Sequence, residues 1–336
     1  MIITLTTDFG MSDAFVGAIK GVILGINPNA QIVDVSHEIP PQDIDRAAFV
    51  VKSAASCFPK GTIHVVVVDP GVGTERPVLA VRTEGGVFLA PDNGVLKYIF
   101  AGHPGAEVFN VTRSEYFRGR VSRTFHGRDI FAPVAAHLSK GLAPEKLGSP
   151  FADFERGSVA RPVRSPNRIA GVIIAFDRFG NGITNIPAEW TEGPNLVRSK
   201  DPVLDGIEGR GHATENPDSV QVEDPVLDGI GGPDSIRTED PDSARNEASA
   251  LIGTEDPNLV RSKDPALDGT EGPDSVTIRV AERTFVSLSR SYLDVAAGEP
   301  LVLAGSADSL EISVNRGSAK AALDLKLGDA VEVLFH

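Results

Sequence analysis

The chain has few of the residues that form cross-links or bind metals. Its 336 residues include one cysteine, Cys57, which excludes a disulfide framework and any zinc or iron–sulfur site built from several cysteines. There is no HExxH motif, and His126 and His137 do not have the spacing of two ligands on one helix face. The sequence therefore predicts no metal centre.

Long apolar runs and an excess of basic residues are also missing. No apolar run approaches the roughly 18 residues of a transmembrane helix. The first residues, MIITLTTDFG, lack a basic region and reach an acid at Asp8, unlike a signal peptide. The formal net charge of -14 argues against a nucleic-acid backbone as the main partner. We expect a cytoplasmic protein with no membrane or nucleic-acid partner.

The usual nucleotide-binding loops are absent as well. No GxGxxG follows the first predicted strand, and the glycines of DPGVGTERP do not form GxxxxGK[ST], which disfavours an NAD enzyme and an NTPase. Aromatic residues make up only 6%, but the hydrophobic content of 41% is near the globular norm. The length favours two folded domains over one.

Residues 192–275 carry almost all of the net charge. These 84 residues hold 20 acids and 7 bases, a balance of -13, whereas the other 252 hold 26 acids and 25 bases. The same segment has 9 prolines, 10 glycines and no aromatic residue. It also repeats itself irregularly, because NLVRSKDP occurs at Asn195–Pro202 and again at Asn258–Pro265.

This composition predicts a disordered insertion at 192–275. Strong self-repulsion and the lack of aromatics leave too little apolar area to offset the entropy of ordering. A calcium-binding acidic repeat is the alternative, although the acids do not follow the D-x-[DN]-x-[DN]-G pattern.

The rest of the sequence divides into two blocks. Residues 1–165 alternate strand-like and helix-like segments and predict an α/β domain with a mostly parallel sheet between helices; the segments are strands at Ile2–Thr6, Gln31–Ser36 and Thr62–Val68 and helices at Asp13–Ile26 and Asp43–Phe58. Residues 166–191 and 276–336 contain short strand-like runs and turn residues, which predict a small all-β domain interrupted by the insertion.

Candidate chemical groups follow the predicted strands of the first block. Asp8 follows the first strand, and Asp69 follows a run of four valines in VVVVDPGVGTER, where ligands of open parallel sheets bind. The turn after Asp69 brings Arg76 back within reach. Each aspartate is equally well explained as a helix or turn cap.

Two further residues each have a functional and a structural explanation. His126 precedes Gly127 and a predicted helix beginning near Asp129, so it is a catalytic candidate or simply a helix cap. Asn181, in FGNGITNI, is a candidate contact or part of a hairpin turn.

Seven strings in order resemble the S-adenosyl-L-methionine hydroxide adenosyltransferases, which are related to fluorinating and chlorinating enzymes. The strings are TLTTDFGMSDAFVGAIKGVI, VDVSHEIPP, VVVVDPGVGTERP, LAPDNGVL, TFHGRDIFAPVAAHL, DRFGNGITNI and SLEISVNRGSA. The resemblance implies an α/β domain followed by a β-barrel-like domain, and a homotrimer with active sites between subunits. It also implies hydrolysis of S-adenosylmethionine to adenosine and L-methionine, with no cofactor, by a triad of Asp69, Arg76 and His126.

The resemblance also implies a set of substrate contacts. It assigns Asp8 to the ribose diol with Asp13 nearby, and the backbone of Gly127 to the nucleophile. Asp177 would pair with the amino group of the substrate, and Asn181 would bond the adenine edge.

The remaining contacts come from the end of the chain. Tyr292 would stack near the base, the backbone of Arg316 would contact the adenine, and Ser306 would hold the carboxylate. The family usually has SSG or a close variant before LEI, whereas this chain reads GSADSLEI, so Ser309 is the alternative to Ser306.

Two other functions compete with hydrolysis. The same scaffold supports halide-dependent cleavage of S-adenosylmethionine, but all three triad positions are present and the extra loop of the fluorinating enzymes is not. The second alternative is a non-catalytic adenosine-binding protein in which the acidic repeats are the functional region.

Overall fold

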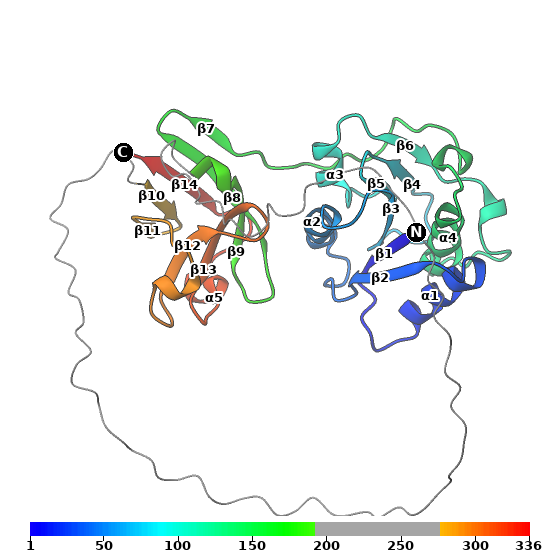
Figure 1. Cartoon of the computed structure of the whole chain (residues 1–336), viewed down its shortest axis with the longest axis horizontal. Coiled ribbons are helices and arrows are strands. Elements are labelled where there is room, and N and C mark those ends of the chain that lie inside the picture. Colours follow the sequence, from blue (N-terminus) through cyan, green and yellow to red (C-terminus); the bar gives the residue numbers. More distant parts are fainter. Residues whose placement is uncertain (192–275) are drawn as a thin grey trace, which may run out of the picture. The chain divides into compact units, whose positions relative to one another are not determined.

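The computed structural model describes residues 1–191 and 276–336. The predicted insertion at 192–275 lies outside these residues. The described part contains an α/β domain and an all-β domain (Figure 1), as the sequence predicts.

The N-terminal domain is built on a six-stranded mixed sheet in the order β2-β1-β3-β5-β4-β6. The first four strands in this order run parallel, while β4 pairs antiparallel with β5 and with β6. The strands are β1 (Ile2–Thr7), β2 (Gln31–Ser36), β3 (Thr62–Val67), β4 (Val78–Arg82), β5 (Gly86–Pro91) and β6 (Glu107–Asn110).

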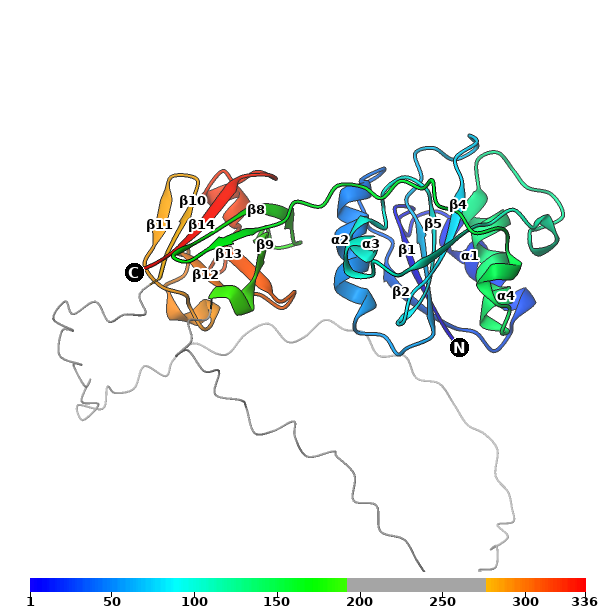
Figure 2. The same ribbon diagram turned by 90° about the horizontal axis from the view of Figure 1, so that it is seen from above.

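Helices cover both faces of this sheet (Figure 2). They are α1 (Phe15–Ile26), α2 (Ile44–Ala55), α3 (Lys97–Gly102) and α4 (Ala132–Ser139). The run of valines in and after β3 shows why both faces are apolar: Val65 and Val67 pack in the cluster with α1 and α4, whereas Val66 and Val68 pack in the cluster with α2 and α3. Alternate side chains of a strand point to opposite faces, so a strand covered on both sides needs a continuous apolar run.

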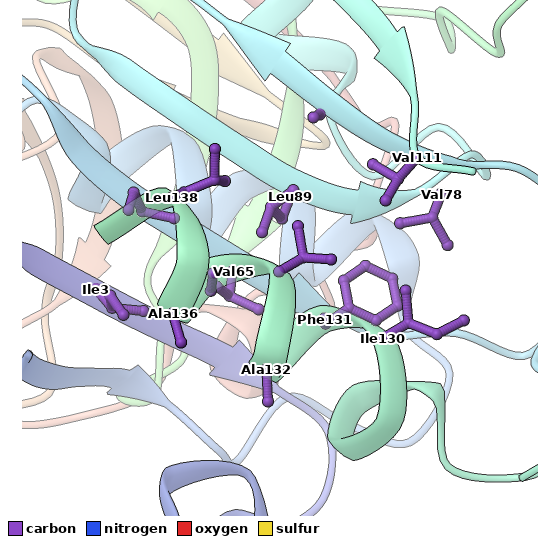
Figure 3. Packing of buried hydrophobic residues seen from close by; sticks show 14 of the residues in the cluster. Ile3, Val65, Val78, Leu89, Val111, Ile130, Phe131, Ala132, Ala136 and Leu138 are labelled. Atoms are coloured by element: carbon purple, nitrogen blue, oxygen red, sulfur yellow. The ribbon is translucent and has the colours of Figure 1, made fainter. Parts of the chain in front are cut away.

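The core beside α4 is the larger of the two. Figure 3 shows Phe131, Ala132 and Leu138 of this segment among strand residues such as Val65 and Leu89. The chain enters α4 through η2, a π-helical turn at Gly127–Phe131. The predicted helix start near Asp129 therefore lies inside this wider turn.

The carboxyl ends of β1 and β3 place two acids at one edge of the sheet. The two strands are parallel neighbours, with Thr6 opposite Val66 and Thr7 opposite Val67. Asp8 follows β1 directly, and Asp69 lies two residues after the end of β3. Parallel pairing is what brings together residues that lie about 60 positions apart.

The C-terminal domain is an antiparallel sheet of eight strands. Its order is β11-β10-β14-β8-β9-β13-β12, with β7 paired to β8. An isolated bridge between Ser289 and Leu303 links the segment after β11 to β12 and nearly closes the sheet into a barrel. The elements are β7 (Val163–Ser165), β8 (Arg168–Phe176), β9 (Gly182–Pro187), β10 (Val276–Val280), β11 (Arg283–Phe285), β12 (Pro300–Ala304), β13 (Ser309–Val314), α5 (Ala319–Ala322) and β14 (Ala330–Phe335).

The strands on either side of the predicted insertion are not neighbours. Ile186 lies on β9 and Val276 lies on β10, and β14 and β8 lie between these two strands. The last strand of the chain thus inserts between the two halves of the domain, with Ile169 on β8 opposite Val333 on β14. Within residues 1–191 and 276–336, no helix is long and apolar enough to cross a bilayer.

Candidate active site

A hollow of about 240 Å³ lies at the edge of the N-terminal sheet where β1 and β3 end. It is lined by four predicted site residues, namely Asp8, Asp69, His126 and Gly127, together with Phe9, Gln42, Val67, Pro70, Val72, Thr124 and Phe125. These residues come from four separate segments of the chain. The sheet edge is therefore the place where the candidate groups of this domain meet.

The turn after β3 is folded tightly enough to return Arg76 to Asp69. The Val72 N–H donates to the carbonyl of Asp69 at 3.1 Å, which closes the turn. Gly73 has a φ of +81°, and a Cβ there would overlap the carbonyl oxygen of Arg123. Only glycine suits such a position.

Asp69, Arg76 and His126 form one hydrogen-bonded unit. Arg76 Nε donates to both carboxylate oxygens of Asp69, at 2.7 and 2.9 Å, and Nη2 donates to Oδ2. The same Nη2 lies 2.9 Å from Nδ1 of His126. Both members of the ion pair are buried, because the side chain of Arg76 is 10% exposed and that of Asp69 is 5% exposed.

Arg76 also defines the state of the His126 ring. A guanidinium has no acceptor, so Nδ1 of His126 must accept in this contact and the proton of a neutral ring lies on Nε2. Burial and the positive charge of Arg76 lower the pKa of His126, while Asp69 and Asp129 oppose that shift. The imidazole is therefore neutral near pH 7.

Asp8 is oriented by the backbone of a neighbouring loop. The Gln42 N–H donates to Asp8 Oδ2 at 2.8 Å, and Oδ1 takes part in no hydrogen bond among the described residues. Gly127 is buried, and a Cβ there would lie 3.2 Å from Ile19 Cδ1. Asp13, by contrast, is exposed before α1 and is not part of the lining of the hollow.

A second group of predicted residues gathers in the C-terminal domain. Asp177 and Asn181 bound the loop between β8 and β9, and Asn181 Nδ2 donates to Asp177 Oδ2 at 2.9 Å. Asp177 Oδ1 accepts from the backbone N–H of Asn181, also at 2.9 Å. The two hydrogen bonds therefore fix the Asp177 carboxylate and the Asn181 amide side by side in this loop.

Tyr292 lies near this loop. Its hydroxyl donates to Glu311 Oε1 at 2.6 Å. Burial, the hydrogen bond to Glu311 and the nearby charges of Glu311 and Asp177 raise the pKa of Tyr292 to about 12. Tyr292 is 41% exposed, so part of the residue is open for contact.

The other C-terminal candidates lie in turns beside β13. Ser306 is exposed in the turn before β13, whereas Ser309 is buried as its first residue. Arg316 is exposed just after the strand and has a φ of +56°. The two serines therefore differ in their exposure to solvent.

Two buried acids went unrecognised in the sequence. Asp129, which is fully buried, and Glu311, which is 6% exposed, each lie beside a candidate group. The available signal was a single charge within an otherwise apolar segment, DIFAPVAAHL or SLEISV. In the described part of the chain, no three His, Cys, Asp or Glu side chains form a group that could hold a metal ion.

Family models match both folded blocks. The model of the SAM hydroxide adenosyltransferase N-terminal domain matches residues 3–148, and that of the C-terminal domain matches residues 261–332.

Individual relatives agree with these models. An (R)-S-adenosyl-L-methionine hydrolase of Thermus thermophilus is 30% identical over 338 residues, covering 98% of this chain and 97% of the relative. One of the same name from Salinispora arenicola is 38% identical over 53% of this chain and 69% of its own length. A fluorinase of Actinoplanes sp. is 29% identical over 55% of this chain and 71% of its own length.

A solved structure supports the same assignment. The crystal structure of an uncharacterized conserved protein from Thermotoga maritima superposes with a TM-score of 0.70 at 31% identity, covering 99% of this chain and 100% of that one. Full-length similarity at this identity, together with matches to both domain models, confirms the resemblance seen in the sequence. The chain belongs to the SAM hydroxide adenosyltransferase family.

Proposed function

We propose that this protein hydrolyses S-adenosyl-L-methionine to adenosine and L-methionine. The observation that carries the proposal is the contact between Asp69, Arg76 and His126 at the hollow of the N-terminal domain. The family assignment and the names of the hydrolase relatives support it.

The triad supplies what a weak nucleophile needs. A water molecule attacks the ribose C5′ in line with the departing sulfur. Because free water has a pKa near 15.7, it needs a proton acceptor and a cation that stabilises the forming hydroxide. Arg76, held by Asp69, is that cation. The two candidate acceptors are the Asp69 carboxylate and His126, whose Nδ1 takes the proton only after it leaves Arg76, because Nε2 of the neutral ring already carries a hydrogen.

Substrate binding then divides between the two domains. In the N-terminal domain the free oxygen of Asp8 accepts from the ribose diol, and the backbone N–H of Gly127 lies at the nucleophile. In the C-terminal domain Asp177 pairs with the amino group of the substrate and Asn181 bonds the adenine edge.

The remaining contacts also come from the C-terminal domain. Tyr292 stacks near the base, and the backbone of Arg316 contacts the adenine. Of the two serines, the exposed Ser306 is free to meet the carboxylate without rearrangement. Asp13 lies outside the lining of the hollow, so we assign it to the edge of the substrate-binding site.

A homotrimer with active sites between subunits completes the proposal. Ligand pockets usually enclose about 300–1,000 Å³, so a hollow of about 240 Å³ holds only part of S-adenosylmethionine. Exposed apolar side chains occur in both domains: Met11 and Phe15 are 62% and 44% exposed, and Phe179 and Leu293 are 74% and 79% exposed. Such side chains favour burial against another subunit.

No cofactor is required by this chemistry. The leaving methionine departs as a neutral thioether, so neither an acid nor a metal ion has to stabilise it. We place the reaction in the cytoplasm, where a protein with a single cysteine is expected.

The test is the fate of S-adenosylmethionine in water labelled with ¹⁸O and free of halide. Purified protein should release adenosine and methionine in equal amounts, with the label in the 5′-hydroxyl of adenosine. The His126→Ala variant is the matched control and should release both products at least about 10²-fold more slowly. Adenosine binding without any turnover would instead support a non-catalytic adenosine-binding protein.

Halide-dependent cleavage is the second candidate, favoured by the fluorinase relative. It predicts that chloride or fluoride produces a 5′-halogenated nucleoside in place of adenosine. The intact triad weighs against it, because water needs the proton acceptor that Asp69 supplies beside Arg76, whereas a halide does not.

A further inference from the structure

Asp129 is a fully buried carboxylate outside the triad and outside the lining of the hollow. Four hydrogen bonds hold it. Oδ2 accepts from the Ser122 N–H at 2.9 Å and from Arg128 Nη2 at 3.0 Å, and Oδ1 accepts from Arg128 Nε at 2.8 Å and from Arg118 Nη1 at 3.2 Å. A buried charge persists only when it is paired in this way.

These contacts join chain positions on both sides of His126. Ser122 lies four residues before the histidine and Asp129 lies three residues after it. The backbone closes the same loop, because the Arg118 N–H donates to the Asp129 carbonyl at 2.9 Å and the Phe125 N–H donates to Ser122 Oγ at 3.0 Å. The carboxylate is thus the centre of the turn that carries the histidine.

The orientation of His126 depends on this turn because its partner is already fixed. Arg76 is held by both oxygens of Asp69. Because the guanidinium is fixed, its 2.9 Å contact with Nδ1 of His126 depends on where the turn places the ring. A hydrogen bond that is misplaced by about 1 Å no longer serves catalysis, which can cost roughly 10²-fold in rate.

We propose that Asp129 is a positioning residue that holds His126 against Arg76 by tying Ser122 and Arg128 into one turn. The proposal rests on the proposed hydrolase function for its kinetic consequence, but its structural consequence for the His126 ring is independent of any substrate.

The charges around the ring agree with this role. The charged groups that face His126 are Arg76 and Asp69, from the turn after β3, and Asp129 from its own turn. Burial lowers the pKa of His126 first and Arg76 lowers it further, while Asp129 raises it. Hydrogen bonds from Arg128 and Ser122 outweigh the effect of burial and keep the pKa of Asp129 low, so its negative charge is permanent.

The experiment compares Asp129→Asn with a control variant outside the N-terminal domain, Ile278→Val, in the core of the C-terminal domain. Asp129→Asn should lower kcat about 10²-fold, while KM for S-adenosylmethionine and the affinity for adenosine change less than about threefold. The control should keep the kcat of the unaltered protein, because removing one methylene costs only about 0.5–1.5 kcal/mol of stability.

Nuclear magnetic resonance of histidine labelled with ¹³C and ¹⁵N gives a readout without substrate. With the His126 signals assigned through His126→Gln, the unaltered protein should show a neutral ring protonated on Nε2. Asp129→Asn should lower the His126 pKa further and mix the two tautomers. Unchanged His126 signals in Asp129→Asn, with or without lost activity, would overturn the proposal.

A milder variant keeps the test decisive should Asp129→Asn fail to fold. Arg118→Met removes only the longest of the four contacts, from a side chain that is 46% exposed. It should mix the two tautomers of His126 as Asp129→Asn does, but to a smaller extent, and an unmixed ring would overturn the positioning role. If the unaltered protein shows the expected ring state but does not cleave S-adenosylmethionine, only the proposed hydrolase function fails.

Discussion

Asp69 and Arg76 place a full ion pair in a largely buried position beside a neutral histidine. The pair is close enough for the carboxylate to take two donors of the guanidinium, which leaves the other hydrogen of Nη2 for His126. Each member of the triad therefore constrains the next, and removing one changes the state of the other two.

Single alanine variants of the triad should show this dependence. Asp69→Ala, Arg76→Ala and His126→Ala should each lower kcat by about 10²–10⁴-fold, the usual range for loss of acid–base assistance. Adenosine affinity should stay nearly constant, since the ribose contact is assigned to Asp8. Steady-state kinetics and calorimetry measure the two quantities. Asp45→Asn, which removes an exposed ion pair with Lys97, is the control, and near-normal kcat in all three alanine variants would refute the assignment.

Asp8→Asn tests the ribose contact. Asparagine keeps an oxygen for the Gln42 N–H but loses the negative charge that strengthens a hydrogen bond from a hydroxyl. Loss of a charge-assisted bond costs about 1.5–3 kcal/mol, so adenosine should bind roughly 10- to 150-fold more weakly.

The matched ligand for this variant is 2′,3′-dideoxyadenosine, which lacks both hydroxyls. Its affinity should change little between the unaltered protein and Asp8→Asn, as measured by isothermal titration calorimetry. Equal losses for the two ligands would mean that Asp8 does not contact the diol.

At the scale of elements, β3 carries a histidine in the middle of a buried strand. His64 is 5% exposed, its Nδ1 lies 2.9 Å from Thr4 Oγ1 on β1, and its ring stacks on Phe88 of β5. Burial lowers the pKa of His64 to about 4. Because burial disfavours the charged ring, the need to protonate His64 makes the sheet sensitive to acid.

The direction of this sensitivity follows from proton uptake. Between pH 6.5 and about 4 the unfolded chain binds a proton at His64 and the folded chain does not, so the free energy of unfolding falls as the pH falls through this window. The loss between pH 7 and pH 4.5 should be about 2–3 kcal/mol larger for the unaltered protein than for His64→Gln, which cannot titrate.

Urea unfolding followed by far-ultraviolet circular dichroism measures that difference. Tryptophan fluorescence is less suitable, because the single tryptophan, Trp190, lies in the C-terminal domain. The carboxylates of both proteins titrate alike and cancel in the comparison. Parallel pH dependences in the two proteins would show that His64 accepts a proton without cost to the fold.

For the whole molecule, complementation between defective subunits tests the proposed homotrimer. His126→Ala damages only the N-terminal part of the site, and Asp177→Ala damages only the C-terminal part. If each site joins the N-terminal domain of one subunit to the C-terminal domain of another, some sites of a mixed trimer are intact. Co-expression should therefore restore measurable turnover that neither variant has alone. No restoration in a mixture shown by mass spectrometry to contain both subunits would place each site within a single chain.

Residues 192–275 provide the second test at this scale. Their charge of -13 and their lack of aromatics predict that they add little to a folded core. A Gly/Ser linker that replaces them must pass two intervening strands between β9 and β10, about 14 Å at the usual strand spacing, so about ten residues are enough.

The linker variant should keep its melting temperature and its turnover of S-adenosylmethionine. Limited proteolysis of the full chain should cut first within 192–275, since exposed flexible segments are cleaved first. Loss of folding in the linker variant, or resistance of the segment to protease, would indicate a folded subdomain in its place.

The sequence by itself determined the fold class, most of the elements and the family. Local patterns were sufficient for this, because the apolar period of 3.6 or 2 and the turn residues depend only on near neighbours. The predicted strand Gln31–Ser36 has the observed bounds, and the predicted ends of the helices at 15–26 and 44–55 lie within about three residues of the observed ends. The similarity of the ordered motifs to the family identified the triad residues. Such an assignment needs only matching positions in the sequence, not the contacts between the side chains.

Only the tertiary structure decided which distant residues come together. Parallel pairing of β1 with β3 brought Asp8 to Asp69, and the insertion of β14 between β8 and β10 set the order of the C-terminal sheet. Asp129 and Glu311 became interpretable only once their buried partners were known. Such placements depend on closing long loops and satisfying buried charges, and those energies arise between residues far apart in the chain.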